Sequence, residues 1–147
     1  MSVTSKRLQT LRALTAAAQS RSGLTSFNHV DHELQEIGRS GKVSPERRRH
    51  LLQVFHGMRA LETALKEVVR SHGLDPKISL GGVLHQLSGF PPNHPAHLSK
   101  KELSRFLNNV KDARNKLMHQ ANTFPNSSKE TDKTLGEIAA CFSLLVR

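Results

Sequence analysis

The chain contains few aromatic residues and almost no cysteine. Tryptophan and tyrosine are absent, aromatic residues make up 4%, and Cys141 is the single cysteine among 147 residues. A hydrophobic core must therefore be built mainly from Leu, Val, Ile, Ala and Phe, which suits helix packing better than a sheet sandwich. Because one cysteine excludes an intramolecular disulfide, we expect a reducing, cytoplasmic location and a small buried apolar role for Cys141.

Long apolar runs are also lacking. No segment approaches the roughly 20 apolar residues that cross a bilayer, so we expect no membrane partner. The N-terminus carries Lys6, Arg7, Arg12 and Arg21, with no acidic residue before Asp31. This pattern weakly resembles a transit peptide, but no apolar segment of a secretory signal follows, and we favour a mature first helix.

Acidic residues are scarce. The 22 Lys and Arg face 12 Asp and Glu, which gives a formal net charge of +10. Such an excess attracts polyanions, mainly nucleic acid. The basic residues gather in three stretches, 6–21, 39–49 and 100–116. This clustering favours contact with RNA or DNA over a merely soluble basic surface.

Apolar residues recur at helical spacing through most of the chain, and no alternating strand pattern competes with them. The pattern predicts an all-α fold, an antiparallel helix bundle of about five helices. Residues 44–147 are expected to form the bundle. Residues 1–43 form an N-terminal helical segment that is either part of the bundle or an appended arm. Three helix starts are predicted from capping residues, at Ser44-Pro45, Ser99–Glu102 and Ser127–Glu130.

One predicted helix ends in Arg114-Asn115-Lys116-Leu117-Met118-His119. At ~100° per residue, its apolar stripe runs through Leu103, Phe106, Val110, Ala113 and Leu117. Arg114 flanks this stripe, whereas Asn115 and His119 lie opposite it as i,i+4 neighbours. Arg114 and His119 are about 140° apart on an ideal helix. Either the helix distorts near His119, or the two groups converge only when two chains meet.

Leu107 and Met118 form a second apolar strip between the core stripe and the motif face. In a monomer this apolar strip would be exposed to water, so we expect a homodimer with Leu107 and Met118 at its interface. The alternative is that they pack against loop 90–98 or the N-terminal helices.

The Arg-Asn-x3-His pattern near a helix end, in a small all-helical chain, resembles the HEPN domain family, over roughly Pro45 to Arg147. Arg114 and His119 have four residues between them, which fits the family's R-x4-6-H spacing. The resemblance implies a metal-independent endoribonuclease of a toxin or defence system, with motif helices face to face in a dimer. It implies that Arg114, Asn115 and His119 are catalytic and that the product is a 2′,3′-cyclic phosphate.

The resemblance also bears on partners. It implies RNA as substrate, no cofactor, and an antitoxin or other regulatory protein. Some HEPN toxins are inactivated on a Tyr two residues after the His; here that position is Ala121 and the chain has no Tyr. HEPN enzymes often place a polar residue of another helix near the motif. Glu62 lies in the longest predicted helix, but the sequence alone does not identify any residue as the equivalent one. Five cations are expected to bind RNA: Lys111, Lys116, Arg105, Arg47 and Arg48.

Two rival readings stay open. One is a non-catalytic HEPN-type dimerising module that binds nucleotide or RNA, and the other is a basic helical nucleic-acid-binding protein with a chance motif. A metal site is not expected. His29-x2-His32 with Glu33, and His94-x2-His97, have metal-like spacing but no Cys ligands and no second matching pair.

Overall fold

The computed structural model describes residues 3–22, 27–119 and 128–146, and every regular element in them is helical. The predicted all-α class is therefore confirmed. The first four helices are α1 (Val3–Ser22), α2 (Asn28–Ser40), α3 (Glu46–Ser71) and α4 (Leu80–Ser88). A composite helix follows, made of α5 (Lys100–Phe106), the π-helical turn η1 (Leu107–Lys111) and α6 (Asp112–His119). The last helix, α7 (Ser128–Phe142), ends in the short 3-10 segment η2 (Ser143–Val146).

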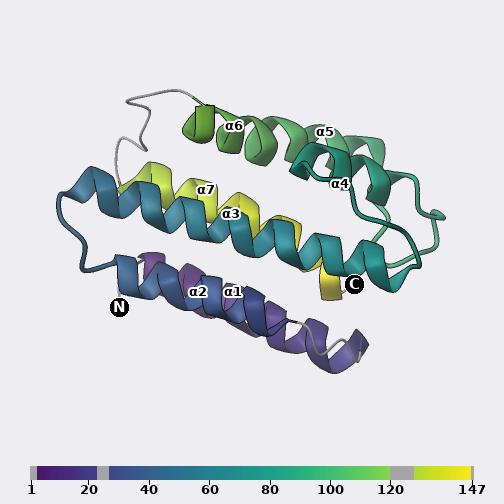
Figure 1. Ribbon diagram of the computed structural model, residues 1–147, viewed down its shortest axis with the longest axis horizontal. Helices are drawn as coiled ribbons and strands as arrows, with labels where there is room; N and C mark the ends of the chain where they lie inside the picture. Colours follow the sequence, from purple (N-terminus) through teal and green to yellow (C-terminus); the bar gives the residue numbers. More distant parts are fainter. Residues whose placement is uncertain (1–2, 23–26, 120–127, 147) are drawn as a thin grey trace.

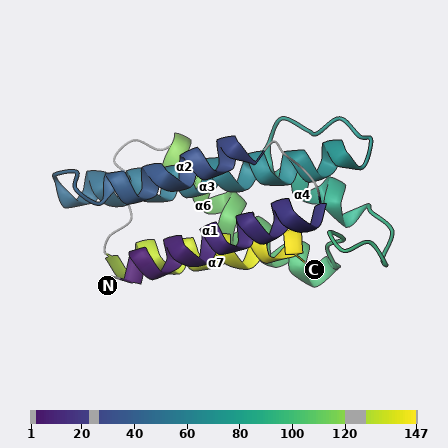
Figure 2. The same ribbon diagram turned by 90° about the horizontal axis from the view of Figure 1, so that it is seen from below.

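The long helix α3 lies at the centre of the bundle (Figure 1). It packs against α2 and α7, and α1 packs against α7 and α2. Seen from below, α2 and α3 lie side by side, as do α1 and α7 (Figure 2). Helices α4, α5 and α6 cover the opposite side of α3 from α1 and α2 (Figure 1). When α5, η1 and α6 are taken as one helix, the described residues form six helices before the short segment η2. About five were expected for such a bundle.

The core is aliphatic and extends into the first two helices. Leu11 of α1 and Val30, Leu34 and Ile37 of α2 are all 0% exposed. Cys141 is likewise 0% exposed within α7, as expected for a small apolar residue. Residues 1–43 thus contribute buried side chains to the same core as α3 and α7. Within the described residues, no helix has both the length and the apolar content needed to cross a membrane.

The predicted helix starts differ in outcome. Ser99 forms a full capping box, because its Oγ accepts from the Glu102 N–H at 3.1 Å and its N–H donates to Glu102 Oε1 at 3.2 Å. The capping role expected of Ser44 is wrong. Pro45 itself occupies the N-cap position of α3, and no side chain caps that helix. The Ser127–Glu130 box begins outside the described residues.

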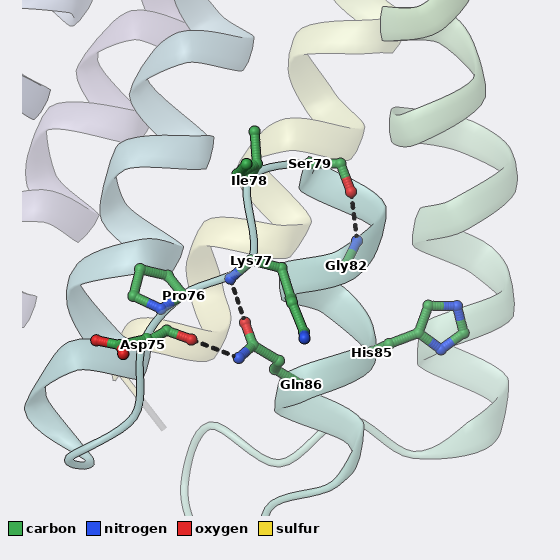
Figure 3. A pocket seen from close by; sticks show the side chains of 8 residues that line it. All are labelled: Asp75, Pro76, Lys77, Ile78, Ser79, Gly82, His85 and Gln86. Carbon is green, nitrogen blue, oxygen red and sulfur yellow. Dashed lines mark hydrogen bonds between the residues drawn. The ribbon is translucent and has the colours of Figure 1, made fainter.

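The loop between α3 and α4 is fastened to α4 by one side chain. Gln86 Oε1 accepts from the Lys77 N–H, and Gln86 Nε2 donates to the Asp75 carbonyl, both at 2.8 Å (Figure 3). A shallow groove of about 720 Å³ lies between this loop and α4. Ile78 projects from the loop with 91% of its surface exposed. The loop is therefore ordered by hydrogen bonds and not by burial of its apolar residue.

Candidate functional site

The helix that carries the motif is not uniformly α-helical. Its π turn, Leu107–Lys111, ends three residues before Arg114. Asn108 and Asn109, weak helix formers, lie in this turn. The distortion expected near His119 is not seen, because residues 112–119 are regularly α-helical, and the helix is distorted upstream of the motif instead. Phe106 and Val110 are buried, and Leu103, Ala113 and Leu117 are half-buried against the core, so the predicted apolar stripe is confirmed.

Arg114 lies on the inner side of α6, against α3. Its Nε is 3.5 Å from Glu62 Oε2, and Glu62 Oε1 is 3.6 Å from Lys66 Nζ. Arg114 is 25% exposed and Glu62 is 15% exposed. Glu62 thus holds two cations on one half-buried carboxylate. The sequence draws attention to Glu62 but does not connect it with Arg114, because the two residues lie on different helices.

The aliphatic part of Arg114 borders a small apolar cavity between α3 and α6. This cavity, of about 20 Å³, is lined by Arg114, Leu117, Leu51, Phe55 and Met58. Long cationic side chains commonly bury their stems in this way while the charged end stays at the surface. Arg114 therefore has a packing role as well as a charge, and it flanks the core as the helix pattern predicts.

The other two motif residues are placed only in part. Asn115 is half-buried, and His119 is the last residue of α6. The side chains of His119 and Met118 lie outside the described residues. Because 112–119 is α-helical, the backbone positions 114 and 119 lie about 140° apart around the helix axis. Their convergence stays a prediction.

Arg105 is strongly engaged within the chain. Its Nε and Nη2 donate to the two carboxylate oxygens of Glu137 at 3.0 and 2.9 Å, and Asn109 Nδ2 donates to the same carboxylate at 3.3 Å. The hydrogen bond from Arg105 lowers the pKa of Glu137, and it raises the pKa of Arg105. Much of the charge that Arg105 would offer to RNA is therefore already compensated.

The other predicted RNA contacts differ in exposure and in their partners. Lys116 is exposed and makes no ion pair within the described residues. Lys111 Nζ is 2.9 Å from Asp112 Oδ1, and its stem lies over Gly81 of α4. Arg47 and Arg48 are exposed in the first turn of α3. This turn lies at the same end of the bundle as the end of α6 (Figure 1).

Leu107 packs within its own chain. It is half-buried, and its Cδ2 would lie 3.8 Å from a Cβ added at Gly81 of α4. Its neighbour is thus α4, a packing partner that the sequence did not suggest. The proposed dimer contact of Leu107 and Met118 stays a prediction.

His94 and His97, one of the two histidine pairs with metal-like spacing, have other partners. His94 Nδ1 accepts from the Ala96 N–H at 3.0 Å, and His97 Nδ1 lies 2.8 Å from the Phe90 carbonyl oxygen. Burial, and secondarily the charge of His72, lowers the pKa of His94. In the part of the chain that the structure describes, no three His, Cys, Asp or Glu residues are grouped to hold a metal.

The motif end of the bundle thus combines Arg114 on a half-buried carboxylate, the motif helix end and several exposed cations. Such an arrangement suits recognition of a phosphate-bearing polymer. No protein-family model matches the chain, and neither a curated protein nor a solved structure is significantly similar to it.

Proposed function

We propose that this protein is a HEPN-like, metal-independent endoribonuclease of a toxin or defence system. The observation that supports it most directly is the position of Arg114. Its Nε is 3.5 Å from Glu62 Oε2, and its side chain is 25% exposed. A guanidinium held at Nε can still offer two parallel N–H donors to a phosphate. Glu62 is then a residue that orients Arg114 toward the substrate.

The chemistry uses the 2′-hydroxyl of the RNA as nucleophile. A base removes its proton, the oxygen attacks phosphorus, and the P–O5′ bond breaks as an acid protonates the leaving oxygen. The products are a 2′,3′-cyclic phosphate and a free 5′-hydroxyl. His119 serves as base or acid, a role for which imidazole is suited, while Arg114 stabilises the negative charge on the phosphorane. Asn115 orients the imidazole.

The two chemical groups require a second chain. Arg114 and His119 leave α6 about 140° apart, too far around one helix for both to contact the same phosphate. A homodimer with α6 helices face to face supplies Arg114 from one protomer and His119 from its partner. Lys116, Lys111, Arg47 and Arg48 then bind the flanking backbone, and an antitoxin or other regulator would cover this cleft.

The test is cleavage of single-stranded RNA in EDTA. His119→Ala should lower the rate about 10²–10⁴-fold, the usual cost of losing a general acid or base. Arg114→Ala should also abolish detectable cleavage. His85→Ala and Arg70→Ala are matched controls, since both residues are exposed on other helix faces, and both variants should cleave like wild type.

Thermal unfolding separates chemistry from folding. His119→Ala should stay within about 0.5 kcal/mol of wild type, as surface changes usually do. Arg114→Ala should cost more, because its stem borders the apolar cavity and Glu62 would keep only Lys66. Wild-type cleavage by His119→Ala would overturn the nuclease assignment. RNA or nucleotide binding without turnover would then support the alternative, a non-catalytic HEPN-type dimerising module.

A further inference from the structure

A second set of cationic groups lies between α2 and α3. Glu33 of α2 reaches two residues of α3: its Oε2 is 2.7 Å from His56 Nδ1, and its Oε1 is 2.9 Å from Arg59 Nε. Glu33 and His56 are each 18% exposed, and Arg59 is 55% exposed. Helices α2 and α6 lie on opposite sides of α3 (Figure 1). This cluster therefore lies on the α2 side of α3, and it borders the motif through Phe55, which also lines the cavity beside Arg114.

The carboxylate fixes the state of the imidazole. An ionised carboxylate only accepts hydrogen bonds, so His56 Nδ1 must carry a proton toward Glu33. The other ring nitrogen, Nε2, has no partner within the described residues. When the ring is protonated, Nδ1 donates to Glu33 and Nε2 becomes a second donor, directed away from the carboxylate.

The guanidinium of Arg59 is fixed from two directions. Its Nε faces Glu33, and its Cζ lies 5.5 Å from the centroid of the Phe55 ring. The half-exposed side chain leaves its terminal nitrogens at the surface. Here one carboxylate orients two donors, the planar guanidinium of Arg59 and the imidazole of His56. The two residues are three positions apart, so their side chains are neighbours on one face of α3.

We infer that Glu33, His56 and Arg59 form a binding site for a phosphate group of single-stranded nucleic acid. Arg59 supplies paired N–H donors to two phosphate oxygens. Protonated His56 donates a third hydrogen bond to the phosphate from Nε2. Arg59 neutralises Glu33, so the carboxylate does not repel the ligand. The net charge of +10 favours a polyanion over a lone phosphate at this surface. The inference does not depend on cleavage.

The experiment measures binding of a short single-stranded RNA whose 2′-hydroxyls are all methylated, so that no cleavage can occur. Fluorescence anisotropy over a salt series gives the slope of log K against log salt. Arg59→Ala should reduce the magnitude of this slope by about 0.7, the value for one lost phosphate contact on a single strand. Arg70→Ala is the matched control, because Arg70 is also on α3, is 54% exposed and is paired with Glu67. Its slope should equal that of wild type.

A second measurement uses the unaltered protein. Addition of the methylated RNA should shift the ¹⁵N resonances of the His56 ring and leave those of His85 unchanged, and inorganic phosphate should act only at far higher concentration. Equal slopes for the two arginine variants would overturn the inference. The inference would also be overturned if the His56 resonances did not shift on addition of RNA. A shift with inorganic phosphate but not with RNA would overturn it as well.

Discussion

At the residue scale, three glutamates act as organisers of basic and polar side chains. Glu62 holds Arg114 and Lys66, Glu33 holds His56 and Arg59, and Glu137 holds Arg105 and Asn109. These are the ion pairs and hydrogen bonds described above. The chain has 12 acidic residues against 22 Lys and Arg, so basic residues outnumber the carboxylates that can pair with them. The cations that pair with these three carboxylates are held within the chain, and the others remain accessible to ligands.

Glu137 makes the stability of the protein depend on pH. Its folded pKa lies below its ordinary value of 4.5, chiefly through the hydrogen bond from Arg105. Such a group contributes stability above pH 4.5, and the contribution is lost as the pH falls through the folded pKa. Glu137→Gln should therefore be less stable than wild type at neutral pH, by no more than about 1 kcal/mol because Arg105 is half-exposed.

Denaturant titrations at several pH values test this. The difference between wild type and Glu137→Gln should shrink steadily below pH 4.5. Glu36→Gln is the control, because Glu36 and its partner Arg39 are 38% and 70% exposed, and it should show a smaller difference. A gap for Glu137→Gln that persists unchanged in acid would contradict the prediction.

Residue positions along one helix were predictable, whereas pairs between helices were not. Arg114 flanks the core as the 3.6-residue period requires, and Ser99 caps its helix as the local sequence requires. The partner of Arg114 depends on how α3 and α6 pack, a relation between segments about 50 positions apart that a local pattern does not encode. The same holds for Glu33 with His56 and Arg59.

At the element scale, the π turn sets the rotational position of the motif. An α-helix forms i→i+4 bonds and a π turn i→i+5 bonds, so Leu107–Lys111 takes in about one residue more than an α-helical turn. Unrolling the sequence at a constant angle cannot reveal this, because the apolar stripe continues on both sides. We expect this extra residue to set the register in which Arg114 faces Glu62.

Deletion of Asn108 tests this relation. The shortened segment should form a continuous α-helix and rotate everything after it by about 100° relative to α5. Arg114 would leave Glu62, and RNA cleavage should be lost while helical circular dichroism is kept. Asn108→Ala keeps the length and should retain cleavage. Wild-type activity in the deletion variant would show that the register of α6 does not matter.

At the scale of the whole molecule, α6 is an outer helix whose contact with α3 is slight and leaves a cavity. An outer helix with an apolar residue beside its polar face is a natural surface for a second copy. Leu107 is already covered by α4, so Met118 is the stronger probe of the dimer.

Sedimentation equilibrium at micromolar concentration should give about twice the 16.3 kDa of one chain. Met118→Glu should shift the equilibrium toward monomer, because the new charge would be desolvated at the interface. The control is Leu74→Glu, which alters an apolar residue that is already 46% exposed in the α3–α4 loop. A strictly monomeric wild type, unaffected by Met118→Glu, would rule out the face-to-face dimer.

The burial of Cys141 makes its thiol a probe of local opening of the fold. Thiol reagents attack the thiolate, and a completely enclosed sulfur is inert toward them. Because no other cysteine competes, modification of the native protein can proceed only as fast as α7 separates from its neighbours. The rate of labelling therefore reports the opening of this helix under native conditions. A cysteine placed at the outlying Ile78 would react at once, so the two time scales could be read from one sample.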